Sequence, residues 1–297
     1  MSDGPASTVP VGFVGLGNMG APMSRRLVAA GHRVRGFDVS EETRRALAEA
    51  GGEPAGSLAE AASDAGLLIL MLPDSRVVEQ VIGDEGLLAA LVPGSIVVDM
   101  SSSEPAATRA LAARLDARGV ELVDAPVSGG VKGAVAGSLT IMVGGSNTAV
   151  ARVRPVLEEL GTVVHAGPVG SGHAIKALNN LLSATHLWIT AEAMAVGQRF
   201  GLDPEVMLSI FNSSSGRSGS TENKWPNFVL TGRYDSGFGL RLMLKDMRIA
   251  VGLADQLGAP SALGADAVEL WARAAEGLPE RADHTEVAKW VQARGGA

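Results

Sequence analysis

The sequence of 297 residues predicts an α/β protein in which an N-terminal sheet covered by helices is joined by a long helix to an all-α domain. Up to about Gly167, short runs rich in leucine and β-branched residues alternate with helical patterns, which is typical of a parallel sheet covered on both faces. A helical pattern then extends from His173 to Phe200, a length of roughly 40 Å for an α-helix. Two domains, residues 9–170 and 171–297, are therefore expected.

The individual elements follow from the same patterns. In the second domain, Asp203 and Pro204 are typical of a helix start, because aspartate caps the first turn and proline is tolerated there. Gly201 is suited to end the preceding helix. Residues 212–228 are polar, rich in glycine and serine and mostly non-periodic, so a loop is predicted. The six strands expected in the first domain are Val11–Gly15, Val34–Asp38, Leu67–Leu72, Ile96–Met100, Glu121–Ala125 and Leu139–Val143.

Composition and charge exclude several functional classes. The 25 basic and 32 acidic side chains give a net charge of −7, which argues against a nucleic-acid partner or an anionic membrane surface. The absence of cysteine excludes disulfides, thiolate catalysis and cysteine-bound metals, and it fits a cytoplasmic protein. The opening MSDGPASTVP has no features of a targeting peptide, and the longest apolar run, Gly66–Leu72, is too short to span a bilayer.

A glycine-rich turn follows the first predicted strand at once. Gly15, Gly17 and Gly20 form the pattern G-x-G-x-x-G before a helix predicted over Ala21–Ala30. Such glycines permit a tight turn, a close approach of the backbone to a pyrophosphate, and close packing of helix on strand. The second predicted strand ends in Asp38, about 20 residues further on, where a carboxylate accepts the ribose hydroxyls of a dinucleotide. The pattern predicts a Rossmann-type dinucleotide-binding domain.

Asp38 also indicates which dinucleotide is bound. A carboxylate at this position repels the 2′-phosphate of NADP, and no basic residue follows it directly. Arg44 and Arg45 lie downstream and are expected on the solvated face of the next helix. NAD is therefore the expected cofactor, with NADP less favoured.

Lys176 and Asn180 are four residues apart within the long helical pattern. They would share one helix face, with Gly172 a further turn upstream leaving space for a ligand. An alcohol that is oxidised by loss of a hydride needs a group that takes its proton, and a partly desolvated lysine can do so. The alternative for these residues taken alone is an ordinary solvated surface of a helix.

The segment Ser128, Gly129 and Gly130 follows a predicted strand that ends in Asp124. Glycines there let backbone N–H groups approach a carboxylate, and the serine hydroxyl adds a donor. A glycine-rich β-turn without a ligand is the alternative. A phosphate-binding P-loop is excluded because Lys132 is followed by glycine rather than by serine or threonine.

The histidines do not suggest a metal site. None of the five forms an H-x-x-x-H or similar pair, so no catalytic metal is predicted. His173 lies one helical turn before Lys176, and a packing or surface role is favoured for it over a place in a binding cleft.

Six motifs occur in an order that resembles the β-hydroxyacid dehydrogenase family, which includes 3-hydroxyisobutyrate dehydrogenase and 2-hydroxy-3-oxopropionate (tartronate semialdehyde) reductase. The resemblance covers nearly the whole chain. It rests on GFVGLGNMG with the following APM, on MLPD (71–74), DMSS (99–102), DAPVSGG (124–130) and GHAIKALNN (172–180), and on Lys245 followed by Asp246.

The resemblance implies a role for each motif. Lys176 would be the general acid and base, Asn180 would orient the substrate hydroxyl, and Ser128, Gly129 and Gly130 would bind the substrate carboxylate. Arg217, in the predicted loop, resembles a segment of the 3-hydroxyisobutyrate dehydrogenases, and its guanidinium could clamp a carboxylate. An exposed loop arginine without a ligand is the alternative. The residues expected to bind the cofactor are Gly15, Leu16, Gly17, Asn18, Met19, Gly20, Asp38, Leu72, Pro73, Ser101 and Lys245.

The predicted function is hydride transfer between NAD and a small β-hydroxy acid or its semialdehyde, as in 3-hydroxyisobutyrate dehydrogenase. Tartronate semialdehyde reductase or another short-semialdehyde reductase is the alternative. Imine reduction ranks lower because related imine-reducing enzymes typically replace the lysine at position 176. A non-catalytic NAD-sensing module ranks lower too, since it needs no proton donor. The resemblance also implies a homodimer or homotetramer, between which the sequence does not choose.

Overall fold

The computed structural model describes residues 10–294, so most of the opening segment in which no targeting signal was found lies outside the described residues. The chain divides into two compact units between Lys176 and Ala177, and each unit is described by itself. Within residues 10–294 no helix has the length and apolar character needed to cross a membrane.

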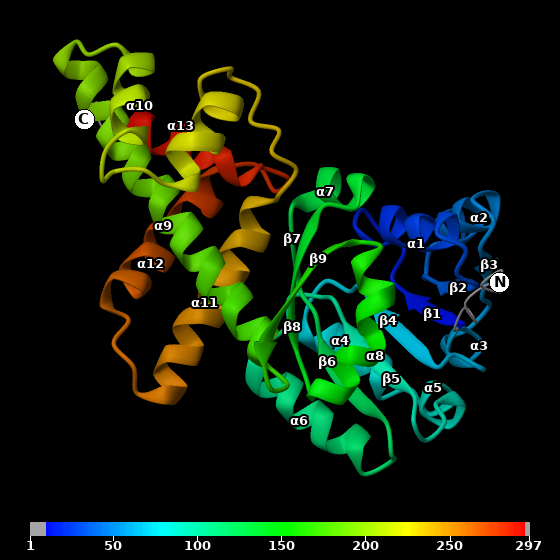
Figure 1. Ribbon diagram of the computed structural model, residues 1–297. Helices are drawn as coiled ribbons and strands as arrows, with labels where there is room; N and C mark the ends of the chain where they lie inside the picture. Colours follow the sequence, from blue (N-terminus) through cyan, green and yellow to red (C-terminus); the bar gives the residue numbers. More distant parts are fainter. Residues whose placement is uncertain (1–9, 295–297) are drawn as a thin grey trace, which may run out of the picture. The chain divides into compact units, whose positions relative to one another are not determined.

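A nine-stranded sheet forms the centre of the N-terminal unit (Figure 1). Its strands run in the order β3-β2-β1-β4-β5-β6-β8-β7, with β9 beside β8. The neighbours from β3 to β6 are parallel, and β1 pairs with both β2 and β4. The strands are β1 Val11–Val14, β2 Val34–Phe37, β3 Glu53–Pro54, β4 Leu67–Leu70, β5 Ile96–Asp99, β6 Glu121–Asp124, β7 Val127–Ser128, β8 Leu139–Gly144 and β9 Gly161–Gly167.

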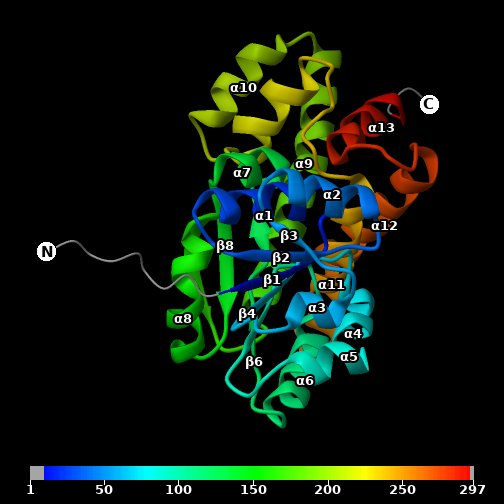
Figure 2. The same ribbon diagram turned by 90° about the vertical axis from the view of Figure 1, so that its right-hand side faces the viewer.

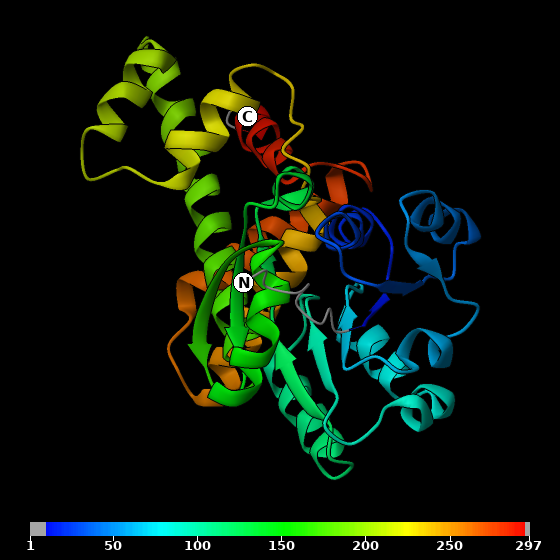
Figure 3. The ribbon, with the colours of Figure 1, turned by 45° about the vertical axis from the view of Figure 1, so that its right-hand side comes forward.

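Helices cover both faces of this sheet, which explains why the central strands β1 and β4 are apolar throughout. In β4, Leu67 and Ile69 pack into one apolar cluster, whereas Leu68 and Leu70 pack into the other, because successive side chains of a strand point to opposite faces. The first cluster is completed by α1, α2, α7 and α8, and the second by α3, α4, α5 and α6 (Figures 2 and 3). These helices are α1 Gly20–Ala29, α2 Glu41–Glu49, α3 Leu58–Ala62, α4 Ser75–Ile82, α5 Glu85–Ala90, α6 Pro105–Asp116, α7 Gly130–Ala136 and α8 Asn147–Glu158.

The predicted α/β class with a parallel sheet is confirmed, and one of the six predicted strands, Leu139–Val143 in β8, departs from the parallel arrangement. Strand β8 runs antiparallel to β6 and β7 and parallel to β9. Strands β3, β7 and β9 were not predicted. β3 and β7 have only two residues each, and β9 is partly exposed and lacks an apolar period, so none carries a pattern that distinguishes it from a loop.

The C-terminal unit is helical and contains a core of its own. Trp225, Trp271, Met247 and Leu187 are buried together in this core. The long helix α9 runs from the N-terminal unit into the C-terminal one (Figure 1). The helices are α9 Ser171–Phe200, α10 Pro204–Asn212, η1 Ser220–Val229, α11 Leu240–Leu257, α12 Ala262–Gly277, η2 His284–Glu286 and α13 Val287–Arg294.

The helix boundaries follow the predicted signals, with one exception. Asp203 caps α10 by accepting the N–H groups of Glu205 and Val206, as expected. The prediction of a loop over residues 212–228 is wrong for its second half, because η1 is a π-helix. Trp225 is buried in the C-terminal core, so tertiary packing overrides a locally polar sequence.

Candidate active site

The segments predicted to bind a dinucleotide lie along one edge of the sheet. Strands β1, β2, β4 and β5 are parallel neighbours, so their carboxyl ends meet at that edge. Gly15 follows β1, Asp38 follows β2, and Leu72 and Ser101 lie two residues beyond β4 and β5. The carboxyl ends of parallel strands are where ligands bind in open α/β sheets.

The three glycines of the motif have different surroundings. Gly15 has a φ of +96°, and a Cβ there would collide with the carbonyl oxygen of Met71. A Cβ on Gly20 would collide with the carbonyl oxygen of Gly15. At Gly17, in contrast, no described atom lies within 4 Å of an added Cβ. Two glycines therefore permit the tight turn of strand into helix, and the third leaves the backbone open to a ligand.

The start of α1 fits an anionic ligand. Its cap, Met19, makes no side-chain cap hydrogen bond, and no residue in its first turn is acidic. The first N–H groups of a helix have no partner within the helix, and the dipole favours negative charge there. A pyrophosphate held by this turn would satisfy these donors, so the residues present fit a dinucleotide.

The carboxylate of Asp38 connects the glycine-rich turn to β2. It accepts the N–H of Leu16 at 2.7 Å and the N–H of Ser40 at 2.9 Å, one on each oxygen. Because each carboxylate oxygen has a further lone pair, Asp38 can also accept the hydroxyls of a ribose. The sequence predicted the ribose contact but not the hydrogen bond from Leu16. Through this hydrogen bond, Asp38 also supports the glycine-rich turn.

The expectation that Arg44 lies on a solvated helix face is wrong. Its side chain is half-buried, donates to the backbone oxygen of Asp38 at 2.5 Å, and lies 5.6 Å from the centre of the Phe37 ring. Arg45 is exposed, as expected, and pairs with Glu41 at 3.4 Å. A guanidinium group therefore lies beside Asp38, the residue predicted to bind the ribose.

Ser101 is a buried residue that supports the neighbouring strand end. Its hydroxyl accepts the N–H of Leu72 at 2.9 Å, and its own N–H donates to Asp99 at 2.9 Å. Glu104 is the cap of α6, and the hydroxyl of Ser103 donates to Asp99 at 2.8 Å. The buried carboxylate recruits this hydroxyl because a buried charge needs donors.

A second buried carboxylate holds the start of α9. Asp124 accepts the N–H of Gly170 at 2.6 Å and that of His173 at 2.8 Å. Burial raises the pKa of the Asp124 carboxyl, while the charge of His173 and these backbone N–H groups act in the opposite direction. The first turn of α9, which precedes Lys176, is thus fixed to the end of β6.

His173 is fully buried, in keeping with the packing role favoured from the sequence. Its Nε2 lies 3.1 Å from the carbonyl oxygen of Ser101, and its Nδ1 lies 2.8 Å from the hydroxyl of Thr108. A carbonyl oxygen only accepts, so Nε2 carries a proton. The imidazole therefore joins the loop after β5, helix α6 and the start of α9 in one hydrogen-bonded network.

The segment Ser128, Gly129 and Gly130 is more than a simple turn. Ser128 ends the short strand β7, and α7 begins at Gly130. Gly129 and Gly130 have φ values of +126° and +60°, which side-chain-bearing residues rarely adopt. An added Cβ on Gly130 would have no described atom within 4 Å, so its backbone is open to a ligand.

Lys176 and Asn180 lie one turn apart on α9, and both are buried, with exposed fractions of 7% and 4%. The Nδ2 of Asn180 donates to Asp246 at 2.6 Å, and Asp246 lies 3.4 Å from the Nζ of Lys245. A carboxylate only accepts, so this contact fixes the orientation of the amide. The amide oxygen accepts the Nδ2–H of Asn179 at 3.3 Å and has a second lone pair for a further donor. The sequence offered the Lys245–Asp246 pair as a motif but gave no sign that Asp246 holds Asn180.

Arg217 has the surroundings of an exposed loop arginine, one of the two possibilities left open by the sequence. It lies in the turn between α10 and η1, is exposed, and pairs with Glu222 at 2.7 Å. Its guanidinium thus already has a carboxylate partner from its own segment. The roles predicted for Arg217 and for the other site residues stay predictions.

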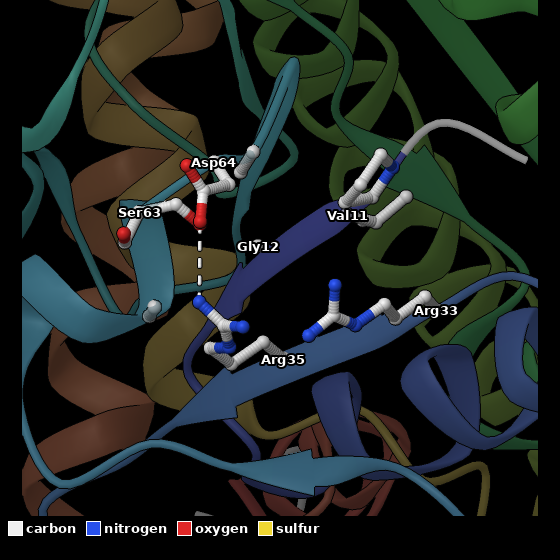
Figure 4. Close-up of a pocket in the computed structure, with 9 residues that line it drawn as sticks. Val11, Gly12, Arg33, Arg35, Ser63 and Asp64 are labelled. Carbon is white, nitrogen blue, oxygen red and sulfur yellow. Dashed lines mark hydrogen bonds between the residues drawn. The ribbon is translucent and has the colours of Figure 1, made fainter.

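A hollow lies at the amino ends of the strands, opposite the segments predicted to bind the cofactor (Figure 4). It is lined by Val11, Arg33, Arg35 and Asp64 among others, near the amino ends of β1 and β2. Arg35 donates to the backbone oxygen of Ser63 at 3.1 Å, and both arginines pair with Glu53 of β3. The pKa of Glu53 is lowered, chiefly by the hydrogen bond from Arg33. The ion pairs of Glu53 with the two arginines therefore join β3 to the neighbouring strand β2.

Two protein families match consecutive parts of the sequence. The family described as the NAD binding domain of 6-phosphogluconate dehydrogenase matches residues 10–168. The family described as NAD-binding of NADP-dependent 3-hydroxyisobutyrate dehydrogenase matches residues 170–291.

Individual proteins match over most of their length. The 3-hydroxyisobutyrate dehydrogenase of Pseudomonas aeruginosa is 40% identical over 269 residues, covering 88% of this chain and 90% of that protein. The 2-(hydroxymethyl)glutarate dehydrogenase of Eubacterium barkeri is 37% identical over 266 residues, covering 89% and 88%. The structure of Mycobacterium tuberculosis 3-hydroxyisobutyrate dehydrogenase with L-serine superposes with a TM-score of 0.91 at 34% identity, covering 96% of this chain and 99% of that one.

Proposed function

Because this chain belongs to the β-hydroxyacid dehydrogenase family, a group of NAD(P)-linked oxidoreductases that act on CH–OH groups, we propose that it interconverts a small β-hydroxy acid and its semialdehyde with NAD. The observation that carries the proposal is the pair Lys176 and Asn180, one turn apart on α9, with the amide of Asn180 fixed by Asp246. The shared helix face supports the proposal, in which Lys176 transfers the proton and the oriented amide of Asn180 accepts a hydrogen bond.

The relatives suggest a common head group for the substrate. 3-Hydroxyisobutyrate and 2-(hydroxymethyl)glutarate, the compounds in the names of two relatives, both have the form HOCH2–CHR–COO⁻. L-Serine, which accompanies the related Mycobacterium tuberculosis structure, has it too, with an ammonium group as R. Glycerate, the product of tartronate semialdehyde reduction, is the member with R as hydroxyl, so the alternative predicted from the sequence lies in the same class.

Each part of the head group has an assigned partner. In the direction of oxidation, the amine of Lys176 takes the hydroxyl proton while the amide oxygen of Asn180 accepts a hydrogen bond from the same hydroxyl. The hydroxyl of Ser128 and the N–H groups of Gly129 and Gly130 hold the carboxylate, which fixes carbon 3 relative to Lys176. NAD, when bound, supplies the hydride acceptor. Burial of Lys176 limits the access of water to the proton transfer.

The preference for NAD over NADP rests on Asp38. Its carboxylate is fixed by Leu16 and Ser40 and would accept the ribose hydroxyls, whereas a 2′-phosphate would meet its negative charge. Arg44 moderates this preference, because its guanidinium beside Asp38 offers a partner to that phosphate. We therefore expect NAD to be the better substrate and NADP to be a measurable one.

A homodimer or homotetramer and a cytoplasmic location belong to the same proposal. On α9, Leu178, Leu182, Ile189 and Val196 are exposed and spaced four and seven residues apart, so they form an apolar stripe along one face. Such stripes mark association surfaces, and light scattering of the purified protein tests for a second copy. The absence of cysteine supports the location, which cell fractionation tests.

The decisive variant is Lys176→Ala, measured by NADH absorbance at 340 nm with a panel of HOCH2–CHR–COO⁻ compounds. Loss of the proton-transfer group is expected to lower kcat by about 10²–10⁴-fold. The affinity for NAD, measured by calorimetry, should stay within a few-fold, since the cofactor segments lie on β1, β2, β4 and β5. Near-normal turnover by the variant would show that Lys176 is not the general acid and base.

A further inference from the structure

Arg26 connects two helices of the N-terminal unit that begin at different predicted binding segments. Helix α1 starts at Gly20, the last glycine of the glycine-rich turn, and α7 starts at Gly130, in the segment predicted to bind the substrate carboxylate. The two helices pack against each other (Figure 2). Arg26 is half-buried in the last turn of α1, and its Nη1 donates to the backbone oxygen of Val135 near the end of α7, at 3.4 Å.

The same guanidinium group has two further contacts. Its Nε donates to the backbone oxygen of Glu159, just beyond the end of α8, at 3.0 Å. It also lies against Gly137, the residue with left-handed backbone that ends α7, where an added Cβ would collide with the central carbon of the guanidinium. One side chain of α1 thus holds the ends of both α7 and α8.

These acceptors suit a cation. The last carbonyl groups of a helix have no partner within the helix, and the helix dipole concentrates negative charge at that end. Val135 belongs to the last turn of α7, and Glu159 is the C-cap of α8. Arg26 therefore supplies the donors and the positive charge that both helix ends favour.

The contact with Arg26 matters because α7 is short and buries little side-chain surface. Of its seven residues, the buried ones are Gly133 and Ala134, which contribute one methyl group between them. At the start of α7, an added Cβ on Gly129 or Gly133 would be in tight contact with Leu139 of β8, so this end of the helix rests on the sheet. Arg26 holds the other end.

We propose that Arg26 is a positioning residue, which sets the place of Ser128, Gly129 and Gly130 relative to the glycine-rich turn. The inference rests on the proposed function, because it takes this segment to hold the substrate carboxylate. A helix of seven residues is only about 10 Å long, so a shift at the end that Arg26 holds also tilts the end that begins at Gly130. Hydride transfer depends on the distance between substrate and nicotinamide, and a misplacement of about 1 Å can lower the rate 100-fold.

Arg26→Ala tests the proposal, and Arg25→Ala, an exposed neighbour on the same helix, is the matched control. We would measure kcat/KM with the best compound of the HOCH2–CHR–COO⁻ panel and the dissociation constant of NAD by calorimetry. Arg26→Ala should lower kcat/KM for the hydroxy acid by about 10–100-fold. The dissociation constant of NAD should change by less than about threefold, because Arg26 lies about 9 Å along α1 from Gly20. Arg25→Ala should match the wild type.

Arg26→Lys should restore part of the lost activity. It keeps a cation that donates to the carbonyl oxygens but lacks the planar fork of the guanidinium, so its kcat/KM should lie between the values of Arg26→Ala and the wild type.

Gly137→Ala disturbs the same contact from the other helix. The added Cβ meets the flexible end of the Arg26 side chain, so the guanidinium group moves rather than the backbone. The variant should lower kcat/KM for the hydroxy acid by about tenfold, and it should have almost no further effect in a protein that already carries Arg26→Ala. Gly258→Ala is the control, because Gly258 is also a left-handed C-cap, at the end of α11, and no described atom lies within 4 Å of its added Cβ.

A merely structural role for Arg26 gives a different pattern. Arg26→Ala would then lower the thermal midpoint but leave kcat/KM unchanged well below that midpoint, and the proposal would be wrong. It would also be wrong if the affinity for NAD fell as much as kcat/KM, if Arg26→Lys restored nothing, or if Arg26→Ala and Gly137→Ala had additive effects. Should circular dichroism show that Arg26→Ala is unfolded, Gly137→Ala compared with Gly258→Ala decides the question.

Lys176→Ala, run in parallel, separates this proposal from the proposed function. Near-normal turnover by Lys176→Ala, or no turnover of any compound by the wild-type protein, would overturn the proposed function and the role of Arg26 with it. Loss of turnover in Lys176→Ala together with normal kcat/KM in Arg26→Ala would overturn only the role of Arg26.

Discussion

Acidification should destabilise the C-terminal unit through His284. This residue is buried, and burial is the main reason why its pKa falls from 6.5 to about 4, with Lys224 acting in the same direction and Asp283 and the backbone oxygen of Phe238 opposing. Its Nδ1 lies near the hydroxyl of Ser236 and the carbonyl oxygen of Phe238. Nε2 has no hydrogen-bond partner among the described residues, so protonation there would create an unsatisfied buried charge.

The size of the effect follows from the two pKa values. Above pH 6.5 the imidazole is neutral in both the folded and the unfolded chain, so it adds no pH dependence. Below pH 6.5 the unfolded chain binds a proton that the folded chain refuses until about pH 4, and the free energy of unfolding falls through this window. At about 1.4 kcal/mol per pH unit, His284 accounts for a loss of about 2 kcal/mol between pH 7.5 and pH 5.

The test compares urea unfolding at pH 7.5 and pH 5 for the wild-type protein and His284→Asn. Tryptophan fluorescence reports on the relevant unit, because all four tryptophans, at 188, 225, 271 and 290, lie in it. The variant should be less stable at pH 7.5 but should lose about 2 kcal/mol less on acidification. His186→Gln, an exposed histidine on α9, is the control and should behave like the wild type. Equal losses in wild type and His284→Asn would refute the reasoning.

Two further predictions concern the N-terminal unit. Asp38→Asn should raise the ratio of kcat/KM for NADP to kcat/KM for NAD by about tenfold. The amide keeps an acceptor for the N–H of Leu16 but removes the charge that would repel a 2′-phosphate. Adding Arg44→Ala should reverse this gain, because it removes the guanidinium group beside that phosphate. An unchanged ratio would mean that Asp38 does not face the ribose. His173→Leu should lower kcat by about 10–100-fold with little change in KM for NAD. The reason is that the carbonyl oxygen of Ser101 loses its hydrogen-bond donor, the imidazole that lies in the first turn of α9. His173→Gln should restore part of the lost activity. Equal kcat values in His173→Leu and wild type would show that this network does not position Lys176.

Local patterns account for the parts of the fold that the sequence predicts well. Each of the strands β1, β4 and β5 has four residues, and all of them are buried. The continuous apolar runs of β1 and β4 reflect a sheet that is covered on both faces. The glycine-rich turn and Asp38 are equally readable, because a tight strand-to-helix turn and its ribose partner recur at a fixed spacing. What the sequence missed lacks a local period: β9 is partly exposed, and η1 folds around the buried Trp225.

Partnerships between distant residues account for what the sequence missed in the site. The carboxylate of Asp246 fixes the amide of Asn180 across 66 residues, and nothing in either segment specifies the other. Arg44 was misplaced for a related reason. A helical period assigns a residue to a face, but the long arginine side chain turns back to the carbonyl of Asp38 and the ring of Phe37.

The contact between Lys224 and Ser183 follows the same rule. It joins residues 41 apart in the sequence, through a helix that the sequence does not predict. The proposed head-group residues, in contrast, lie in short contiguous motifs. Relatives 40% and 37% identical to this chain carry names with different substrates. Because the proposed motifs account only for the head group that these substrates share, the substituent R depends on contacts between distant segments, which local sequence patterns do not reveal.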